Sequence, residues 1–112
     1  MIQEVDILKE STIEKKLVYG VRNFGWRALK FISPGNDGVP DRIVLGPPGH
    51  VIFVELKTDS GKLTRLQQIQ IGKLRKLGMD VRVLYGAKGV EEFLQEVAGY
   101  ALRAPRLSAP GD

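Results

Sequence analysis

Residues 40–57 constrain the fold of this chain most, because they combine two short apolar runs with a Gly/Pro turn. The turn, Gly46-Pro47-Pro48-Gly49, predicts an antiparallel hairpin. Side chains alternate between the two faces of a strand, so one face of the second run carries Val51, Phe53, Glu55 and Lys57. The other face carries Ile52, Val54 and Leu56. Glu55 and Lys57 are therefore predicted to be neighbours on one face.

Acidic side chains accompany both runs of this hairpin. Burying the Glu55 carboxylate at the end of an apolar strand costs free energy unless it is paired or bound to a cation. Asp41 opens the preceding strand, and the hairpin would bring it towards Glu55 and Lys57. Acids are also common where a strand begins, so Asp41 can simply mark that boundary. Two converging acids and a lysine suit a hard divalent cation and predict metal-dependent phosphodiester hydrolysis.

A first helix is predicted to begin at Ser11 and run to about Asn23. Ser11-Thr12-Ile13-Glu14 matches a capping box, in which Glu14 reaches back to the start of the helix. Glu14 also shares a face with the apolar positions Leu17, Val18 and Val21. Two roles are therefore open for Glu14, helix capping and a place in a metal site beside the sheet.

The segment between this helix and the hairpin contains candidate phosphate contacts. A strand is predicted over residues 26–32, where Lys30 lies near the carboxylates or is an ordinary surface charge. Residues 33–40 are too rich in Gly, Pro and Asn for regular structure, so a loop is expected to deliver Asp41. Ser33 and the backbone amides of this loop can contact a phosphate, although a plain connector explains them too.

Arg42 and His50 are two further polar residues of the hairpin. Arg42 can pair with Asp41 or with a DNA phosphate. His50 follows the turn, and we expect it to be an exposed loop residue with no catalytic role.

A second helix is predicted from Arg65 to about Leu77, capped by Thr64 and ended by Gly78. Gln67 falls on its buried stripe and needs hydrogen-bond partners, either at a functional site or in a helix-to-backbone contact. The outer edge of this helix and its entry are basic, which suits either solvent or a DNA backbone. The residues of this edge are Lys62, Arg65, Lys73, Arg75 and Lys76.

The last elements predicted are a strand over residues 79–85, a helix over 90–102 and a disordered tail over 103–112. Residues 1–102 are predicted to form a single domain. This order of elements predicts an α/β sandwich with a mixed sheet. With no cysteine and one histidine among 112 residues, disulfides are excluded and an ordinary zinc site is not expected. Carboxylates remain as the metal ligands.

The N-terminal sequence has no signal-peptide pattern, and no run approaches the roughly 18 apolar residues that span a bilayer. We therefore expect an intracellular protein that does not enter the membrane. The net charge of +4 suits a polyanionic partner and equally suits an ordinary solvated surface.

The pair Pro40-Asp41 followed by Glu55-Leu56-Lys57 resembles the signature of PD-(D/E)XK nucleases. The surrounding residues resemble the VRR-NUC branch of that superfamily, from about Glu14 to Val83. They are Glu14, Ser33-Pro34-Gly35, Gly38-Val39-Pro40-Asp41-Arg42 and Gln67. The resemblance implies the restriction-endonuclease-like αβββαβ core with a mixed sheet flanked by helices.

The resemblance also implies roles for individual residues. It favours the metal site for Glu14, which with Asp41, Glu55 and the backbone carbonyl of Leu56 would hold one or two Mg²⁺ or Mn²⁺ ions. Lys57 would orient or deprotonate the attacking water. Gln67 would hold Lys57 or that water in place. Candidate DNA contacts are Lys30, Ser33, Arg42, Lys62 and Arg65.

Stand-alone members of the resembled family look like homodimeric endonucleases that act on branched DNA such as four-way Holliday junctions. A protein of this kind is expected in the cytoplasm of a bacterial or phage-infected cell. The alternative is a DNA-binding module that keeps the nuclease fold without activity. The complete set of acids, lysine and glutamine argues against it, because clustered carboxylates do not help a simple binder of a polyanion. An α/β protein with an unrelated partner is a third interpretation.

Overall fold

The computed structural model describes residues 4–103 and confirms the predicted order of helices and strands. The elements are α1 (Glu4–Arg22), β1 (Arg27–Lys30), β2 (Arg42–Gly46), β3 (His50–Lys57), α2 (Arg65–Lys76), β4 (Asp80–Tyr85) and α3 (Gly86–Arg103). Apart from Arg103, which ends α3, the predicted tail lies outside the described residues. No helix within the described range is long and apolar enough to cross a membrane.

The four strands form one mixed sheet in the order β1-β2-β3-β4. Strands β1, β2 and β3 pair antiparallel, and β4 joins β3 in parallel. The predicted hairpin is present, with Gly46 opposite His50 and a turn closed by a 2.9 Å hydrogen bond from Gly49 N to Gly46 O. A parallel neighbour requires a crossover, which α2 provides. The end of β3 and the start of α2 lie in one region of the molecule, where Gln67 contacts Glu55.

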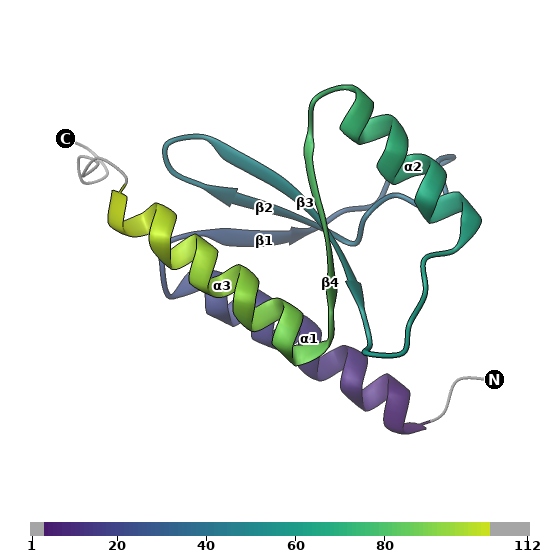
Figure 1. Cartoon of the computed structure of the whole chain (residues 1–112), viewed down its shortest axis with the longest axis horizontal. Coiled ribbons are helices and arrows are strands. Elements are labelled where there is room, and N and C mark those ends of the chain that lie inside the picture. The colour runs from purple at the N-terminus through teal and green to yellow at the C-terminus, as the bar shows by residue number, and fades with distance from the viewer. Residues whose placement is uncertain (1–3, 104–112) are drawn as a thin grey trace.

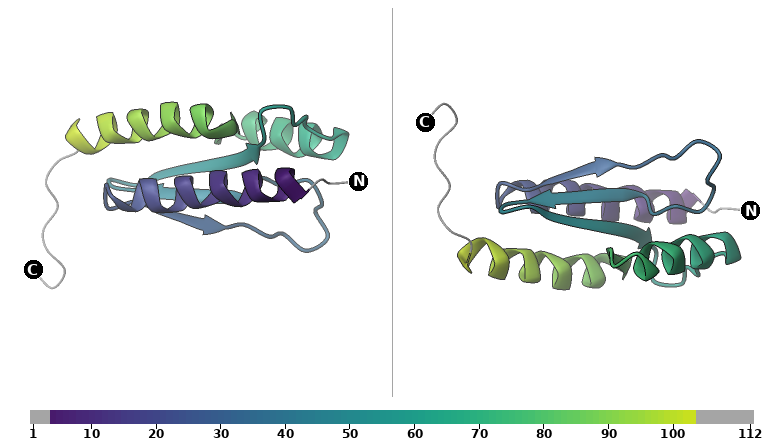
Figure 2. Two further views of the ribbon diagram at one scale, coloured as in Figure 1. Left: turned by 90° about the horizontal axis from the view of Figure 1, so that it is seen from below. Right: turned by 90° about the horizontal axis from the view of Figure 1, so that it is seen from above.

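Helices α1 and α3 run side by side and pack on one face of the sheet, whereas α2 lies on the other side of β4 (Figures 1 and 2). The main core lies under α1 and α3, where Ile52 and Val54 of β3 are buried. Other members of this core are Leu17, Val21, Trp26, Val44, Val90, Phe93 and Val97. The residues that alternate with Ile52 and Val54 on β3, including Glu55, therefore face away from this core.

Helix α1 begins at Glu4, seven residues before the predicted start, so the prediction that Ser11 and Glu14 form a capping box is wrong. Residues 4–10 contain neither glycine nor proline, and nothing in them stops the helix from extending past the local Ser-x-x-Glu signal. Glu14 therefore lies in mid-helix. The conflict between its two possible roles disappears.

His50 does not lie in an exposed loop as expected. It is the first residue of β3 and is half-buried. Its ring stacks on Trp26 at a centroid distance of 5.1 Å and lies 4.6 Å from the ring of Tyr100. Trp26 and Tyr100 come from segments far apart in sequence, so the aromatic contacts of His50 depend on the packing of α3 against the hairpin.

Replacing Gly46 by alanine is expected to lower the free energy of unfolding by about 1–3 kcal/mol. A Cβ at this position would overlap the indole ring of Trp26, which is 1% exposed and has little room to move. Gly72→Ala is the control, because nothing lies within 4 Å of its added Cβ in α2. It should raise stability by about 0.5–1 kcal/mol. Urea denaturation measures both, and equal effects of the two substitutions would contradict the steric explanation.

Candidate active site

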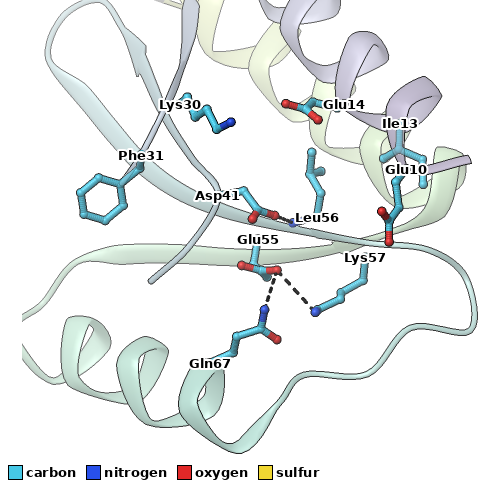
Figure 3. A pocket seen from close by; sticks show the side chains of 10 residues that line it. All are labelled: Glu10, Ile13, Glu14, Lys30, Phe31, Asp41, Glu55, Leu56, Lys57 and Gln67. Atoms are coloured by element: carbon cyan, nitrogen blue, oxygen red, sulfur yellow. Dashed lines mark hydrogen bonds and ion pairs between the residues drawn. The ribbon is translucent and has the colours of Figure 1, made fainter. Parts of the chain in front are cut away.

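A pocket of about 360 Å³ opens where β2 begins, β3 ends, and α1 and α2 approach the sheet. Its wall brings together all five residues predicted to be catalytic, although they come from four separate elements or loops (Figure 3). The lining residues are Glu10, Ile13, Glu14, Lys30, Phe31, Asp41, Glu55, Leu56, Lys57 and Gln67.

Glu55 is the most buried polar side chain of this pocket, with 2% of its surface exposed. Its Oε2 accepts a 3.2 Å hydrogen bond from Gln67 Nε2 and lies 3.6 Å from Lys57 Nζ. Its Oε1 has no hydrogen-bond partner among the described residues. Burial and the nearby Asp41 carboxylate raise the pKa of Glu55 to about 7, and Lys57 offsets part of that rise. A buried carboxylate oxygen of this kind is suited to binding a cation.

Asp41 stands at the entrance of β2 and faces the end of β3. Its Oδ2 accepts a 3.0 Å hydrogen bond from the backbone N–H of Leu56. Its backbone carbonyl accepts a 2.8 Å hydrogen bond from Phe31 N, which continues the pairing between β1 and β2. These two bonds hold the acidic group beside Glu55, as the hairpin predicts.

Gln67 joins the start of α2 to the buried carboxylate. Its backbone N–H donates to Thr64 Oγ1 and its side-chain Oε1 accepts from Thr64 N, at 3.1 and 2.9 Å, so the predicted Thr64 cap is confirmed. The amide nitrogen remains free to donate to Glu55. Gln67 therefore makes a backbone contact through its side-chain oxygen, as one interpretation predicts, while its side-chain nitrogen reaches a carboxylate of the pocket. The hydrogen-bond partner of its side-chain nitrogen is Glu55, whereas the resemblance implies that Gln67 holds Lys57 or the attacking water.

Glu14 lines the pocket, but its carboxylate is held by the guanidinium of Arg42. The Arg42 side chain is 15% exposed and also donates a hydrogen bond to Ala28 O at 3.4 Å. Arg42 therefore pairs with Glu14 instead of with Asp41. In the part of the chain that the structure describes, no three Asp, Glu, His or Cys side chains lie close enough together to hold one ion. Asp41 and Glu55 are thus adjacent, while Glu14 is engaged elsewhere.

The remaining predicted DNA contacts fall into two groups. Lys30 lines the pocket, and Ser33 lies in the adjoining loop, where its hydroxyl accepts a 2.9 Å hydrogen bond from Asn36 Nδ2. Lys62 and Arg65 are exposed and do not line the pocket. All four remain accessible from solvent at or beyond the rim of the site.

Glu10 is the pocket residue that the sequence reasoning missed. It lies one turn before Glu14 on α1 and lines the same cavity. Because the helix was predicted to begin at Ser11, Glu10 was assigned to the segment outside it. The four-residue spacing between the two glutamates is the signal that indicates a shared helix face.

The oxygen atoms of this pocket fit a divalent cation. Asp41 and Glu55 place two carboxylates side by side, and the unpartnered, buried Glu55 Oε1 supplies a ligand atom with no competing donor among the described residues. A bound cation would also offset the burial and the repulsion from Asp41 that raise the pKa of Glu55.

Replacing Gly38 by alanine is expected to disturb this site by pushing the loop before Asp41 away from α2. Gly38 has φ +91°, and its added Cβ would lie 2.6 Å from the carbonyl carbon of Leu66 and 2.9 Å from Gln67 N. Gly35 of the same loop has φ +82° but open space around its added Cβ, so Gly35→Ala is a matched control for backbone strain alone. We expect Gly38→Ala to lower the free energy of unfolding by about 1–3 kcal/mol more than Gly35→Ala in chemical denaturation. Equal losses would show that the loop does not depend on this close approach.

Comparisons with known proteins find similar domains. The model of the VRR-NUC domain matches residues 13–88. A protein named "Putative nuclease p44", from Acyrthosiphon pisum secondary endosymbiont phage 1, is 47% identical over 78 residues, covering 70% of this chain and 84% of that protein. A solved structure described as a VRR_NUC domain superposes with a TM-score of 0.73 at 28% identity, covering 78% of this chain and 95% of the other. The matched region contains Glu14, Asp41, Glu55, Lys57 and Gln67.

Proposed function

This chain belongs to the VRR-NUC domain family, and from that premise we propose that it is a DNA nuclease that hydrolyses phosphodiester bonds with a divalent cation. The family model spans residues 13–88 of the 112-residue chain, and the phage relative is named a nuclease. The observation that carries the proposal is the buried Glu55 carboxylate, which has an unpartnered oxygen in a pocket that also contains Asp41 and Lys57.

Asp41 and Glu55 would hold one or two Mg²⁺ or Mn²⁺ ions, with Glu14 and the backbone carbonyl of Leu56 as further ligands. These ions prefer oxygen ligands and tolerate waters among them. When bound, such an ion would lower the pKa of a coordinated water and would compensate negative charge on the phosphate.

The remaining residues position the reacting groups. Lys57, 16% exposed and anchored near Glu55, would orient the attacking water as an ammonium group or accept its proton as a neutral amine. Gln67 would keep the Glu55 carboxylate in one orientation through its 3.2 Å hydrogen bond. The Thr64 cap fixes Gln67 in turn, so the start of α2 acts as a support for the site.

The ion pair between Glu14 and Arg42 would have to break before the Glu14 carboxylate could coordinate the cation. The Glu14 side chain is 45% exposed, so it has room to turn towards Asp41 and Glu55. Arg42 would then be free to meet a DNA phosphate, to which guanidinium groups bind well. Lys30, Ser33, Lys62 and Arg65 are the further residues proposed to contact the DNA backbone.

Branched DNA, such as a four-way junction, is the substrate class we propose, cut by a homodimer. The sequence has no recognisable zinc finger or series of stacking aromatics, which argues against base-specific reading. Two active sites related by a twofold axis would suit paired cuts in opposite strands. Because the similar protein belongs to a phage, the proposed setting is the cytoplasm of a bacterial or phage-infected cell.

Labelled linear duplex, flap and four-way junction DNA, each incubated with Mg²⁺ or with EDTA, test the proposal. We expect products only with the metal and most product from the branched substrates. Sedimentation of the protein alone should give the mass of two chains, and the complex with a junction should contain two chains for each DNA molecule. Binding without product under every condition would favour the non-catalytic DNA-binding module, and no DNA affinity at low salt would exclude both functions.

A further inference from the structure

We infer that Glu10 is a second acidic residue of α1 that takes part in binding the divalent cation, an inference that rests on the proposed function. Glu10 lines the pocket together with Asp41 and Glu55. It lies three residues before the region that the family model matches, which begins at residue 13. The inference therefore concerns this chain and does not follow from its family.

The geometry of α1 directs Glu10 to the site. Residues four apart on a helix lie on the same face and about 6 Å apart along its axis. Figure 3 shows Glu10 extending from α1 towards the end of β3, where Leu56 and Lys57 lie. Both glutamates line the same pocket.

The ion pairs of the pocket favour Glu10 over Glu14 as the α1 carboxylate that is available. Arg42 occupies Glu14, whereas no hydrogen bond or ion pair holds the Glu10 carboxylate among the described side chains. Glu10 is also exposed, so its long side chain can adjust to a bound ion directly or through a water.

A separate observation indicates that this pocket takes a cation. Glu55 is 2% exposed, and its Oε1 is buried without a hydrogen-bond partner in the described part of the chain. Two adjacent carboxylates leave most positions around an ion unfilled, because Mg²⁺ takes about six ligands. The exposed Glu10 carboxylate on the facing helix would turn towards Asp41 and Glu55 to contribute one of them or to orient a coordinated water.

Calorimetric titration of the full chain with Ca²⁺ at pH 8 tests this role without requiring turnover. Glu10→Gln is expected to weaken Ca²⁺ binding by about tenfold. Glu10→Asp, which keeps the charge but shortens the side chain, should also weaken binding if the carboxylate must reach the ion or its water. Glu92→Gln is the matched control, because Glu92 is exposed on α3 outside this pocket and its loss changes the net charge equally.

The outcomes separate this inference from the proposed function. If the unmodified chain binds Ca²⁺ and Glu55→Gln abolishes binding, but Glu10→Gln binds normally, the role of Glu10 is overturned and the metal-dependent function stands. Normal Ca²⁺ binding by Glu10→Asp together with weak Ca²⁺ binding by Glu10→Gln would mean that Glu10 acts only through its charge at a distance. That result would overturn the contact of its carboxylate with the ion or with a coordinated water. No Ca²⁺ binding by the unmodified chain would overturn both proposals.

Discussion

Replacing Lys57 by alanine is expected to lower the rate of DNA cleavage by about 10²–10⁴-fold while leaving the fold and DNA binding in place. The ammonium lies 3.6 Å from Glu55 Oε2 at the wall of the pocket, where it can act on a water beside the carboxylates. Its removal leaves no cavity in the main core, of which Lys57 is not a member. Single-turnover cleavage of a junction substrate, together with the thermal midpoint, measures both effects.

The control for Lys57→Ala is Lys88→Ala. Lys88 is exposed on α3 and does not line this pocket, but its loss changes the net charge by the same amount. A fall in cleavage for both variants would indicate weaker attraction to DNA in general. Full turnover by Lys57→Ala would remove Lys57 from the reaction.

Replacing Glu55 by glutamine is expected to abolish metal-dependent cleavage and yet to stabilise the metal-free protein at pH 8 by about 3 kcal/mol. Burial and the adjacent Asp41 raise the pKa of Glu55 from 4.5 to about 7. Above pH 7 the folded protein therefore carries a buried charge that the unfolded chain exposes to water. Glutamine has nearly the same shape and removes that charge.

The sign of this effect depends on pH. Below the unfolded pKa of 4.5 Glu55 is protonated in both states, so the substitution changes stability little. Between pH 4.5 and about 7 the unfolded state loses its proton first, and the advantage of glutamine grows with pH. At pH 5 we expect Glu55→Gln to raise the free energy of unfolding by about 1 kcal/mol. Addition of Mg²⁺ at pH 8 should stabilise the unmodified protein and so reduce the difference in stability between the two proteins. Urea denaturation at both pH values measures this difference.

Glu96→Gln is the control, for which the expected change in stability at pH 8 has the opposite sign. Hydrogen bonds from Arg82 lower the pKa of Glu96, so its contribution to stability is present above the unfolded value of 4.5 and is lost as pH falls through the lower folded value. At pH 8 this variant should therefore be less stable than the unmodified protein. A destabilised Glu55→Gln variant at pH 8 would contradict the unfavourable burial of Glu55.

The hairpin and its chemical groups could be predicted because they depend on local features of the chain. A Gly/Pro turn between two apolar runs sets the register, and the twofold alternation of a strand sets the face on which Glu55 and Lys57 lie. The Thr64 cap depends on residues three positions apart and was predictable for the same reason. The start of α1 was not, because a capping signal does not stop a helix when the preceding residues also favour it.

The partners of the charged side chains were decided by the tertiary structure. Sequence spacing alone did not indicate that Arg42 would take Glu14, that Gln67 would donate to Glu55, or that His50 would stack on Trp26. Each of these contacts joins elements that meet only after the helices pack on the sheet. The sequence by itself determined that Glu55 and Lys57 share one face of β3 and that the hairpin brings Asp41 towards them, since strand alternation and the turn are local properties. Only the packed fold decided which of those groups is engaged and which is free, because one ion pair excludes another across the same space.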